Sequence, residues 1–351
     1  MSPRIFLTWF VVTVVTVVLA IVVGLGRETA SFDLGNGEPV FENLREDPDS
    51  PSKIEVKSRF GEFTLVRDGD DWVTPERANY PVEANDVRRL IVSLADMRYV
   101  ERKTANPERF RRLEVQDIDE ELADSAYVKV SNADGGVLAE LIVGRPSARF
   151  FGGSSSGTYI RFPDTTDTWL VSSVTNVQTR LVPWLNREIV KIPADTVARI
   201  AIGEGEEAYV LSRADAESEF VIEGAPEGRT ADPEKVRPIN RALANAELED
   251  VKQRSEFSLP DGATVAEVVT FDGLSIRAEL VKEDRKQWAT FEASYVGEAN
   301  DTSEGANAAR AAVETINARV GDWVYWVPGS VFTNLTRPVE ELLTPLGPDA
   351  S

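Results

Sequence analysis

Residues 5 to 25 form an unbroken run of twenty-one uncharged, mostly apolar residues, IFLTWFVVTVVTVVLAIVVGL. Because a helix rises about 1.5 Å per residue, this run is long enough to cross the roughly 30 Å hydrocarbon core of a bilayer. The pattern predicts a transmembrane anchor. Only Arg4 and the amino terminus precede it, so the positive-inside rule leaves the short N-terminus in the cytoplasm and places the chain after the anchor in the periplasm. Residues 1–26 are thus predicted to comprise the cytoplasmic tip and the transmembrane anchor.

A cleaved secretory signal is the alternative interpretation of the same run. Gly24, Leu25 and Gly26 fit a small-x-small cleavage site, but the apolar part of a signal peptide is usually about 7 to 15 residues long. The length therefore favours an uncleaved anchor in the bacterial inner membrane. Because the chain has no cysteine, a lipid-modified N-terminal cysteine is excluded.

The chain changes character after the anchor. Residues 27–52 are rich in Gly, Asp, Glu, Asn and Pro and show little periodicity, which predicts an extended stalk. The globular part begins near Lys53 and ends near residue 340, before a tail of residues 341–351. A part of this length predicts two domains, at about 100 to 200 residues each.

Two segments of the globular part share an alternating apolar pattern. Residues 53–67, KIEVKSRFGEFTLVR, align with residues 199–213, RIAIGEGEEAYVLSR, and each pattern predicts a β-hairpin. A short strand follows each hairpin, with Trp72 and Phe220 in equivalent positions. The aligned pairs are Ile54 and Ile200, Val56 and Ile202, Phe63 and Tyr209, Leu65 and Leu211, and Arg67 and Arg213.

A helix is predicted after each hairpin. Apolar residues recur at helical spacing over residues 87–97 in the first copy and over residues 236–246 in the second. Asp232 and Pro233 supply an N-cap and a first-turn proline. Pro238 lies deeper and should kink or shorten the second helix, because proline lacks the N–H of an interior helical residue.

Each copy then returns to strands. Residues 126–144 and 265–281 have alternating patterns interrupted by Asp134-Gly135 and Asp272-Gly273, and these dipeptides predict hairpin turns. Further strands follow, and a short helical segment is predicted near the end of each copy, over residues 173–181 and 330–338.

These patterns predict an α+β fold. It consists of an N-terminal transmembrane helix followed by two tandem, similar α+β lobes with mainly antiparallel sheets. The lobes are predicted at residues 53–196 and 197–340, with residues 182–187, VPWLNR, as a packed connector.

Composition narrows the chemistry that this fold can carry. The chain has no His and no Cys, so Ser-His-acid triads, cysteine nucleophiles, disulfides and His/Cys zinc sites are excluded. Its 59 acidic and 38 basic residues give a net charge of −21, which opposes nucleic-acid binding. We interpret the acidity as favouring solubility. No catalytic, cofactor-binding or metal-ligating residue is predicted.

Three short segments carry candidate chemistry. Residues 149–157 contain Phe150, Phe151, Gly152 and Gly153, and we interpret them as a hairpin tip with candidate partner contacts rather than a phosphate loop, because a strand follows and not a helix. Asp68-Gly69-Asp70-Asp71 predicts a tight turn and lacks the spacing of a calcium loop. Residues 117–121, DIDEE, predict a solvated acidic surface rather than paired catalytic carboxylates.

The repeated pattern resembles a known bacterial family. The residues that carry the resemblance are LVRDGDDW from residue 65, YPVEANDVRRLIVSLADM from residue 80, WLNREI from residue 184 and VARIAI from residue 197. Over about residues 5 to 340 the chain resembles the domain of unknown function 4340. The resemblance implies an N-terminal membrane helix, an exported α+β region and association with ABC-2-type exporters and gliding-motility-like auxiliary proteins. It supplies no site residues.

We therefore expect a non-catalytic, membrane-anchored, extracytoplasmic accessory or scaffold subunit of an ABC-type transport complex, whose partners are integral membrane transporter subunits. One alternative is a periplasmic binding module that holds a glycan, peptide or lipid between the lobes. Another is a carboxylate-dependent envelope hydrolase, which would need two converged carboxylates about 5 to 10 Å apart in a cleft.

Overall fold

The computed structural model describes residues 37–147, 157–258, 260 and 262–345. The expected anchor at residues 5–25 and the expected partner contacts Phe150, Phe151, Gly152 and Gly153 lie outside these ranges. Within them, none of the helices combines the length and the apolar character needed to span a membrane.

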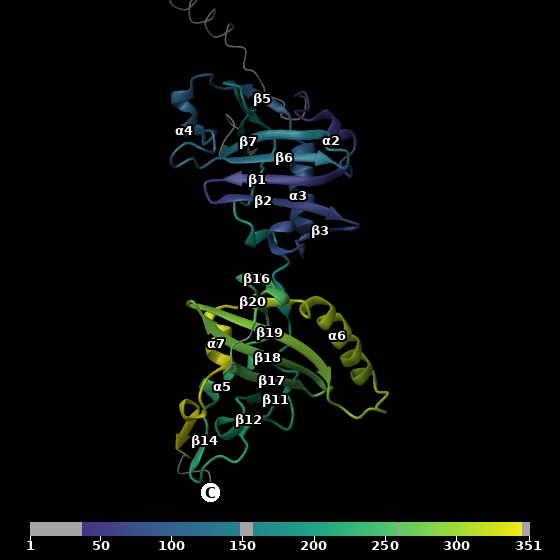
Figure 1. Ribbon diagram of the computed structural model, residues 1–351, viewed down its shortest axis with the longest axis vertical. Coiled ribbons are helices and arrows are strands. Elements are labelled where there is room, and N and C mark those ends of the chain that lie inside the picture. The colour runs from purple at the N-terminus through teal and green to yellow at the C-terminus, as the bar shows by residue number, and fades with distance from the viewer. Residues whose placement is uncertain (1–36, 148–156, 259, 261, 346–351) are drawn as a thin grey trace, which may run out of the picture. The chain divides into compact units, whose positions relative to one another are not determined.

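The chain forms mostly antiparallel sheets with some helices, as an α+β fold requires (Figure 1). One sheet has nine strands in the order β4-β3-β2-β1-β6-β7-β8-β9-β5. Its strands are β1 Pro51–Ser58, β2 Gly61–Asp68, β3 Asp71–Thr74, β4 Tyr80–Pro81, β5 Tyr99–Arg102, β6 Ala126–Asn132, β7 Val137–Ser147, β8 Gly157–Arg161 and β9 Thr168–Val171.

A second sheet has eight strands in the order β13-β12-β11-β17-β18-β19-β20-β16. This order matches β3-β2-β1-β6-β7-β8-β9-β5 of the first sheet strand for strand. Its strands are β11 Val197–Ile202, β12 Tyr209–Ser212, β13 Val221–Ile222, β16 Asp250–Gln253, β17 Thr264–Thr270, β18 Leu274–Glu283, β19 Lys286–Tyr295 and β20 Trp323–Trp326.

Two short ladders and the helices complete the described part of the chain. The ladders pair β10 Glu188–Val190 with β15 Ala246–Glu247 and β14 Arg229–Ala231 with β21 Leu343–Pro345. The α-helices are α2 Glu42–Glu46, α3 Ala84–Ala95, α4 Phe110–Leu113, α5 Pro233–Asn240, α6 Glu304–Val320 and α7 Gly329–Leu335. The 3-10 helices are η1 Pro75–Arg77, η2 Pro107–Arg109, η3 Val182–Trp184, η4 Gly205–Glu207, η5 Arg254–Glu256 and η6 Val339–Glu341.

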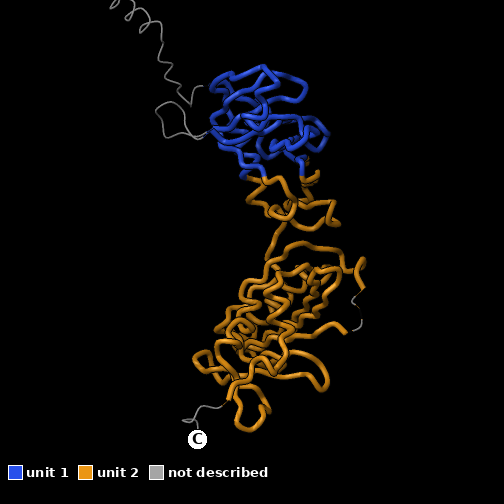
Figure 2. The backbone as a smooth tube through the Cα atoms, turned by 90° about the vertical axis from the view of Figure 1, so that its left-hand side faces the viewer, with its two compact units in different colours: residues 1–51, 57–59, 89–177 blue, residues 52–56, 60–88, 178–351 orange. Residues whose placement is uncertain are grey.

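The chain divides into two compact units (Figure 2). Unit 1 comprises residues 1–51, 57–59 and 89–177, and unit 2 comprises residues 52–56, 60–88 and 178–351. Unit 2 thus contains the whole eight-stranded sheet together with the segment from β2 to β4. The lobe boundaries expected from the repeat remain a prediction.

The periodic segments form the expected elements. The residues that recur at helical spacing lie on α3 and just after it, and all are buried: Val87, Leu90, Ile91, Leu94 and Met97. Asp232 caps α5 by accepting a hydrogen bond from the Glu234 amide at 3.0 Å. Pro238 lies inside α5, which has 8 residues against 12 in α3, so the predicted shortening is confirmed.

The predicted turns are also confirmed. Gly135 (φ 82°) joins β6 to β7, and Gly273 (φ 87°) joins β17 to β18. Both residues adopt the left-handed backbone that glycine tolerates without strain. Gly69 (φ 62°) forms the tight turn between β2 and β3, where Asp68 pairs with Asp71.

The prediction of a helix at residues 173–181 is wrong, because that segment contains no helix. Val174, Thr175, Val177 and Thr179 are β-branched and lose rotamer freedom in a helix. The amide of Thr175 instead donates to the Thr158 hydroxyl at 3.0 Å. Its counterpart at residues 330–338 does contain a helix, α7.

The 17-residue helix α6 was not anticipated. It packs against β18 and β19, as Figure 1 shows. Its Asn317 side chain donates to the Ala293 carbonyl at 2.8 Å and accepts from the Ala293 amide at 2.7 Å. The pairing of β19 with β20 is confined to Trp288 and Ala289, so this amide group satisfies β19 backbone groups that β20 does not reach.

Unit 1 contains a small core beside β7 that excludes any larger residue at Gly144. Phe110, Val115 and Ile142 form the core, and buried Arg161 donates to the Val115 carbonyl at 2.9 Å. A Cβ atom on Gly144 would lie 2.3 Å from the Leu113 carbonyl oxygen and 2.6 Å from Val115 Cγ1.

We expect Gly144→Ala to destabilise the protein by about 1–3 kcal/mol, because backbone atoms must move to admit the methyl group. Gly329→Ala is the matched control, since a Cβ there meets nothing within 4 Å. It should leave stability unchanged or raise it slightly. The midpoints of urea unfolding of the two variants test this prediction. Equal midpoints would refute it.

Candidate functional site

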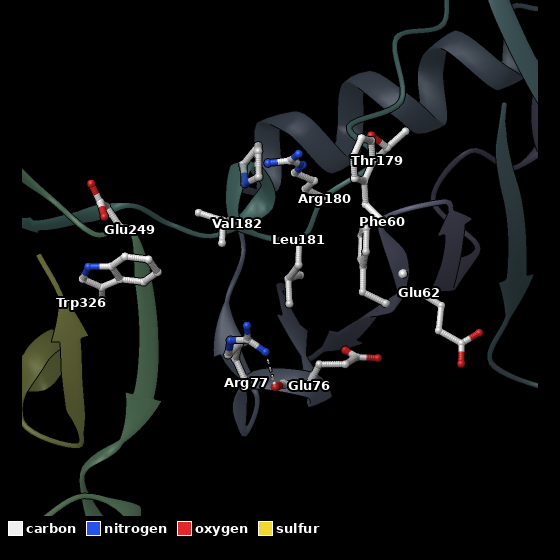
Figure 3. Close-up of a pocket in the computed structure, with 13 residues that line it drawn as sticks. Phe60, Glu62, Glu76, Arg77, Thr179, Arg180, Leu181, Val182, Glu249 and Trp326 are labelled. Carbon is white, nitrogen blue, oxygen red and sulfur yellow. Dashed lines mark hydrogen bonds between the residues drawn. The ribbon is translucent and has the colours of Figure 1, made fainter. Parts of the chain in front are cut away.

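A cavity of about 590 Å³ is the first part of the candidate site. Figure 3 shows Trp326 on one side of it, Phe60 on the opposite side and Leu181 between them. All of its lining residues belong to unit 2. They are Phe60, Gly61, Glu62, Phe63, Glu76, Arg77, Thr179, Arg180, Leu181, Val182, Pro183, Glu249 and Trp326.

A second cavity, of about 460 Å³, adjoins the first, since Glu76 and Arg77 line both. It also lies within unit 2. The four residues of β16 and the three residues of η1 contribute most of its lining. The full set is Pro75, Glu76, Arg77, Ala78, Asp250, Val251, Lys252, Gln253 and Glu256.

An ion pair between Arg77 and Asp250 lies where the cavities meet. Arg77 Nε donates to Asp250 Oδ1 at 2.7 Å and Nη2 donates to Oδ2 at 3.0 Å. The Val251 amide donates to the same carboxylate at 2.9 Å. The hydrogen bond to Asp250 raises the pKa of Arg77 above its ordinary value. The bidentate geometry fixes the orientation of the two side chains relative to each other.

A strained turn presents Arg77. Ala78 and Asn79, which follow it, have φ values of 52° and 62°, and neither is a glycine. Such residues cost roughly 1–2 kcal/mol each. The amides of Ala78 and Asn79 donate back to the Pro75 and Thr74 carbonyls at 3.1 and 3.0 Å. These bonds offset the strain and hold η1 in place.

Tyr80 supports the turn through its hydroxyl group and its ring. Its hydroxyl donates to the Asn186 carbonyl at 3.0 Å, and its ring packs edge-on against Trp323 with centroids 4.9 Å apart. Burial raises the pKa of Tyr80 to about 12. Tyr325 also contacts this ring, at a centroid distance of 6.4 Å, and burial raises its pKa too.

The predicted connector forms a wall of the first cavity. Trp184 and Leu185 are each only 2% exposed. The Trp184 indole N–H donates to the Gln178 carbonyl at 2.9 Å, and the Trp184 backbone carbonyl accepts from the Glu83 amide at 2.7 Å. These contacts hold residues 181–183 against the cavity.

The lining of the first cavity includes a cation–π contact and several carboxylates. Arg180 lies over the ring of Phe60 at 4.4 Å from its centroid, a cation–π contact. Phe60 is 49% exposed. Carboxylates of Glu62, Glu76 and Glu249 lie among the lining residues. The cavity lining thus combines apolar and charged side chains.

The sequence-predicted candidates lie elsewhere. Asp117 forms an ion pair with buried Arg161 while its own side chain stays 62% exposed. Glu120 accepts from the Gln116 side chain at 3.1 Å, so residues 117–121 form a hydrogen-bonded surface turn. Among the described residues, no group of three or more Asp or Glu is positioned to hold a metal ion.

Sequence reasoning missed Arg77 and Asp250. They are 173 residues apart, and neither belongs to a periodic or motif-like segment. The turn after Arg77 also lacks the glycine that usually signals a left-handed backbone.

We expect a double-mutant cycle of Arg77→Ala and Asp250→Ala to give a coupling energy of about 1–2 kcal/mol, because the side chains are only 31% and 18% exposed. The Arg237–Glu234 pair, 52% and 73% exposed, is the control and should couple by about 0.5 kcal/mol or less. Urea unfolding of all variants measures both energies. Equal coupling energies for the two pairs would show that the Arg77–Asp250 pair contributes no more to stability than an exposed ion pair does.

Stability should fall as the pH rises from 10 to 12, because Tyr80 ionises near 10.0 when unfolded but near 12 when folded. Its contribution is fully present below pH 10 and is lost as pH rises through the folded-state pKa. Tyr80→Phe, which cannot ionise, should lose less stability over this range. At neutral pH it should cost about 1 kcal/mol, because the bond to Asn186 is lost. Urea midpoints at several pH values test this, and parallel pH profiles would contradict it.

Comparisons with known proteins give one match. No curated protein and no solved structure matches this chain. The family model described as "Domain of unknown function (DUF4340)" matches residues 72–264, a narrower span than the residues 5 to 340 over which the resemblance was expected. The matched span includes Arg77, Asp250 and the connector, and it exceeds half of the 351 residues. The chain therefore belongs to the family of the domain of unknown function 4340.

Proposed function

We propose that this protein is a membrane-anchored, extracytoplasmic accessory subunit of an ABC-type transport complex in the bacterial inner membrane. The apolar run at residues 5–25 would be its single transmembrane helix, with the C-terminal region in the periplasm. Its mechanism is contact with integral membrane transporter subunits. The family's expected association with ABC-2-type exporters supports this proposal.

The observation that carries the proposal is the chemistry of the first cavity. Aromatic and aliphatic side chains line it together with charged ones. Interfaces depend on a few buried anchors inside a polar rim. A half-exposed phenylalanine held by a stacked arginine, Phe60 on Arg180, is suited to be one such anchor.

We also propose that residues 53–196 and 197–340 are two copies of one α+β unit. The matching strand order of the two long sheets supports this. The aligned apolar residues Ile54 and Ile200, and likewise Leu65 and Leu211, are all fully buried at 0% exposure. A duplicated unit presents two equivalent sets of strand edges and loops. Only one of the two sets needs to bind a partner.

A periplasmic binding module for a glycan, peptide or lipid is the second candidate. The volume of the first cavity, about 590 Å³, favours it, because small-molecule sites are usually about 300–1,000 Å³. Native mass spectrometry of the purified protein separates the two candidates. A retained small ligand supports the binding module, and co-purifying membrane subunits support the accessory role.

We expect the full-length protein to resist carbonate extraction from membranes and to co-purify with transporter subunits in mild detergent. Phe60→Ala should reduce this co-purification by about tenfold or more, as loss of an interface hot spot does. Phe271→Ala is the matched control, since Phe271 is 46% exposed and also lies near an arginine, Arg213. Quantitative mass spectrometry of the purified material gives the readout.

Two results would count against the proposal. Carbonate-soluble protein with a mature N-terminus near Arg27 would replace the anchor with a cleaved signal. The absence of any integral membrane subunit from the purified material would remove the accessory role.

A further inference from the structure

Strand β16 ends the eight-stranded sheet, and its strand neighbour in the described part of the chain is β20. Asp250 pairs with Trp326 and Lys252 with Val324, and the Arg254 amide donates to the Asp322 carbonyl at 2.8 Å. In an antiparallel ladder, alternate residues direct their N–H and C=O groups to opposite sides. The backbone groups of Val251 and Gln253 therefore point away from β20.

This outer edge faces the second cavity. All four residues of β16 line that cavity, and η1 supplies the opposite wall. The Val251 amide is occupied by the Asp250 carboxylate at 2.9 Å, whereas within the described residues no strand pairs with the outward groups of Gln253. An unpaired edge beside a groove is the arrangement that accepts an added strand.

The groove continues beyond this edge. Because Glu76 and Arg77 line both cavities, a segment that leaves β16 past the Arg77–Asp250 pair reaches the first cavity. There it meets Leu181, Val182 and Trp326. One extended segment can thus make backbone bonds in the second cavity and bury an apolar side chain in the first.

The charges of the groove select the segment. Five carboxylates line the two cavities, against three cations. Arg77 and Asp250 neutralise each other, and Lys252 Nζ lies over the Trp288 ring at 4.4 Å from its centroid. Glu76 and Glu256 are exposed beside the β16 edge. A cationic segment complements them.

We propose that this groove binds an extended, basic segment of a partner protein, which adds to the sheet as a strand beside β16. The inference rests on the proposed function and identifies the partner chemistry of that site. Backbone hydrogen bonds to the Val251 carbonyl and to the outward N–H and C=O of Gln253 provide affinity, Glu76 and Glu256 select cationic side chains, and the first cavity takes an apolar residue.

Fluorescence anisotropy with a labelled ten-residue peptide of alternating Lys and Val tests the proposal on the full chain in mild detergent. We expect saturable binding that weakens with salt. A peptide of alternating Glu and Val should bind at least about tenfold more weakly, because like charges repel. The Lys-Val peptide with alternate amides N-methylated keeps its charge but loses N–H donors, and should also bind at least about tenfold more weakly.

Charge reversal locates the site. Glu256→Lys, alone and together with Glu76→Lys, should weaken binding of the Lys-Val peptide by about tenfold and reduce the salt dependence of that binding. The matched control is Glu206→Lys with Glu207→Lys, two exposed residues of η4, which should change binding less than about twofold. Glu256 is exposed and belongs to η5 rather than to the turn around Arg77, so the single variant remains informative if Glu76→Lys disturbs the turn.

Three results would overturn the proposal. These are no binding of the Lys-Val peptide, equal binding of its N-methylated form, and equal weakening by the control reversal. The outcome of this test is separate from that of the proposed function. If the peptide binds but no membrane subunit co-purifies, the groove proposal is supported and only the accessory role is refuted.

Discussion

The candidate site depends on the ion pair between Arg77 and Asp250. It joins residues 173 positions apart in the sequence through two hydrogen bonds, and it lies where two cavities meet. Because both side chains are more than half buried, removing one partner leaves the other with an uncompensated charge. The pair therefore keeps η1 beside β16, and the shape of the groove follows from that contact.

The surrounding structure offsets the cost of this arrangement. Two consecutive non-glycine residues with positive φ follow Arg77, and strain of this kind persists only where neighbouring contacts determine the backbone. Tyr80, packed on Trp323, and Trp184, bonded to Gln178, supply those contacts. Rigid support of this kind reduces the entropy lost when a partner binds.

The acidic composition bears on recognition as well as on solubility. A net charge of −21 repels anionic partners at long range and attracts cationic ones. At the groove, the same bias is local, since carboxylates outnumber cations among the lining residues. A partner with a basic extended segment would be attracted at a distance and then held by backbone hydrogen bonds and apolar contact.

The sequence by itself determined the elements whose signals are local. Alternation at Ile54 and Ile200, the helical spacing of residues 87–97, the cap at Asp232 and the Asp-Gly turns depend on near neighbours, and each predicted its element. The cap at Ser303 and the alanine-rich residues 304–320 carried a helix signal of the same kind that was overlooked. Only the tertiary structure decided that the Thr175 amide bonds to the Thr158 hydroxyl, that Asn317 satisfies β19, and that Arg77 meets Asp250. Those outcomes depend on partners distant in the sequence, and the energy of a long-range contact leaves no periodic trace in either segment that makes it.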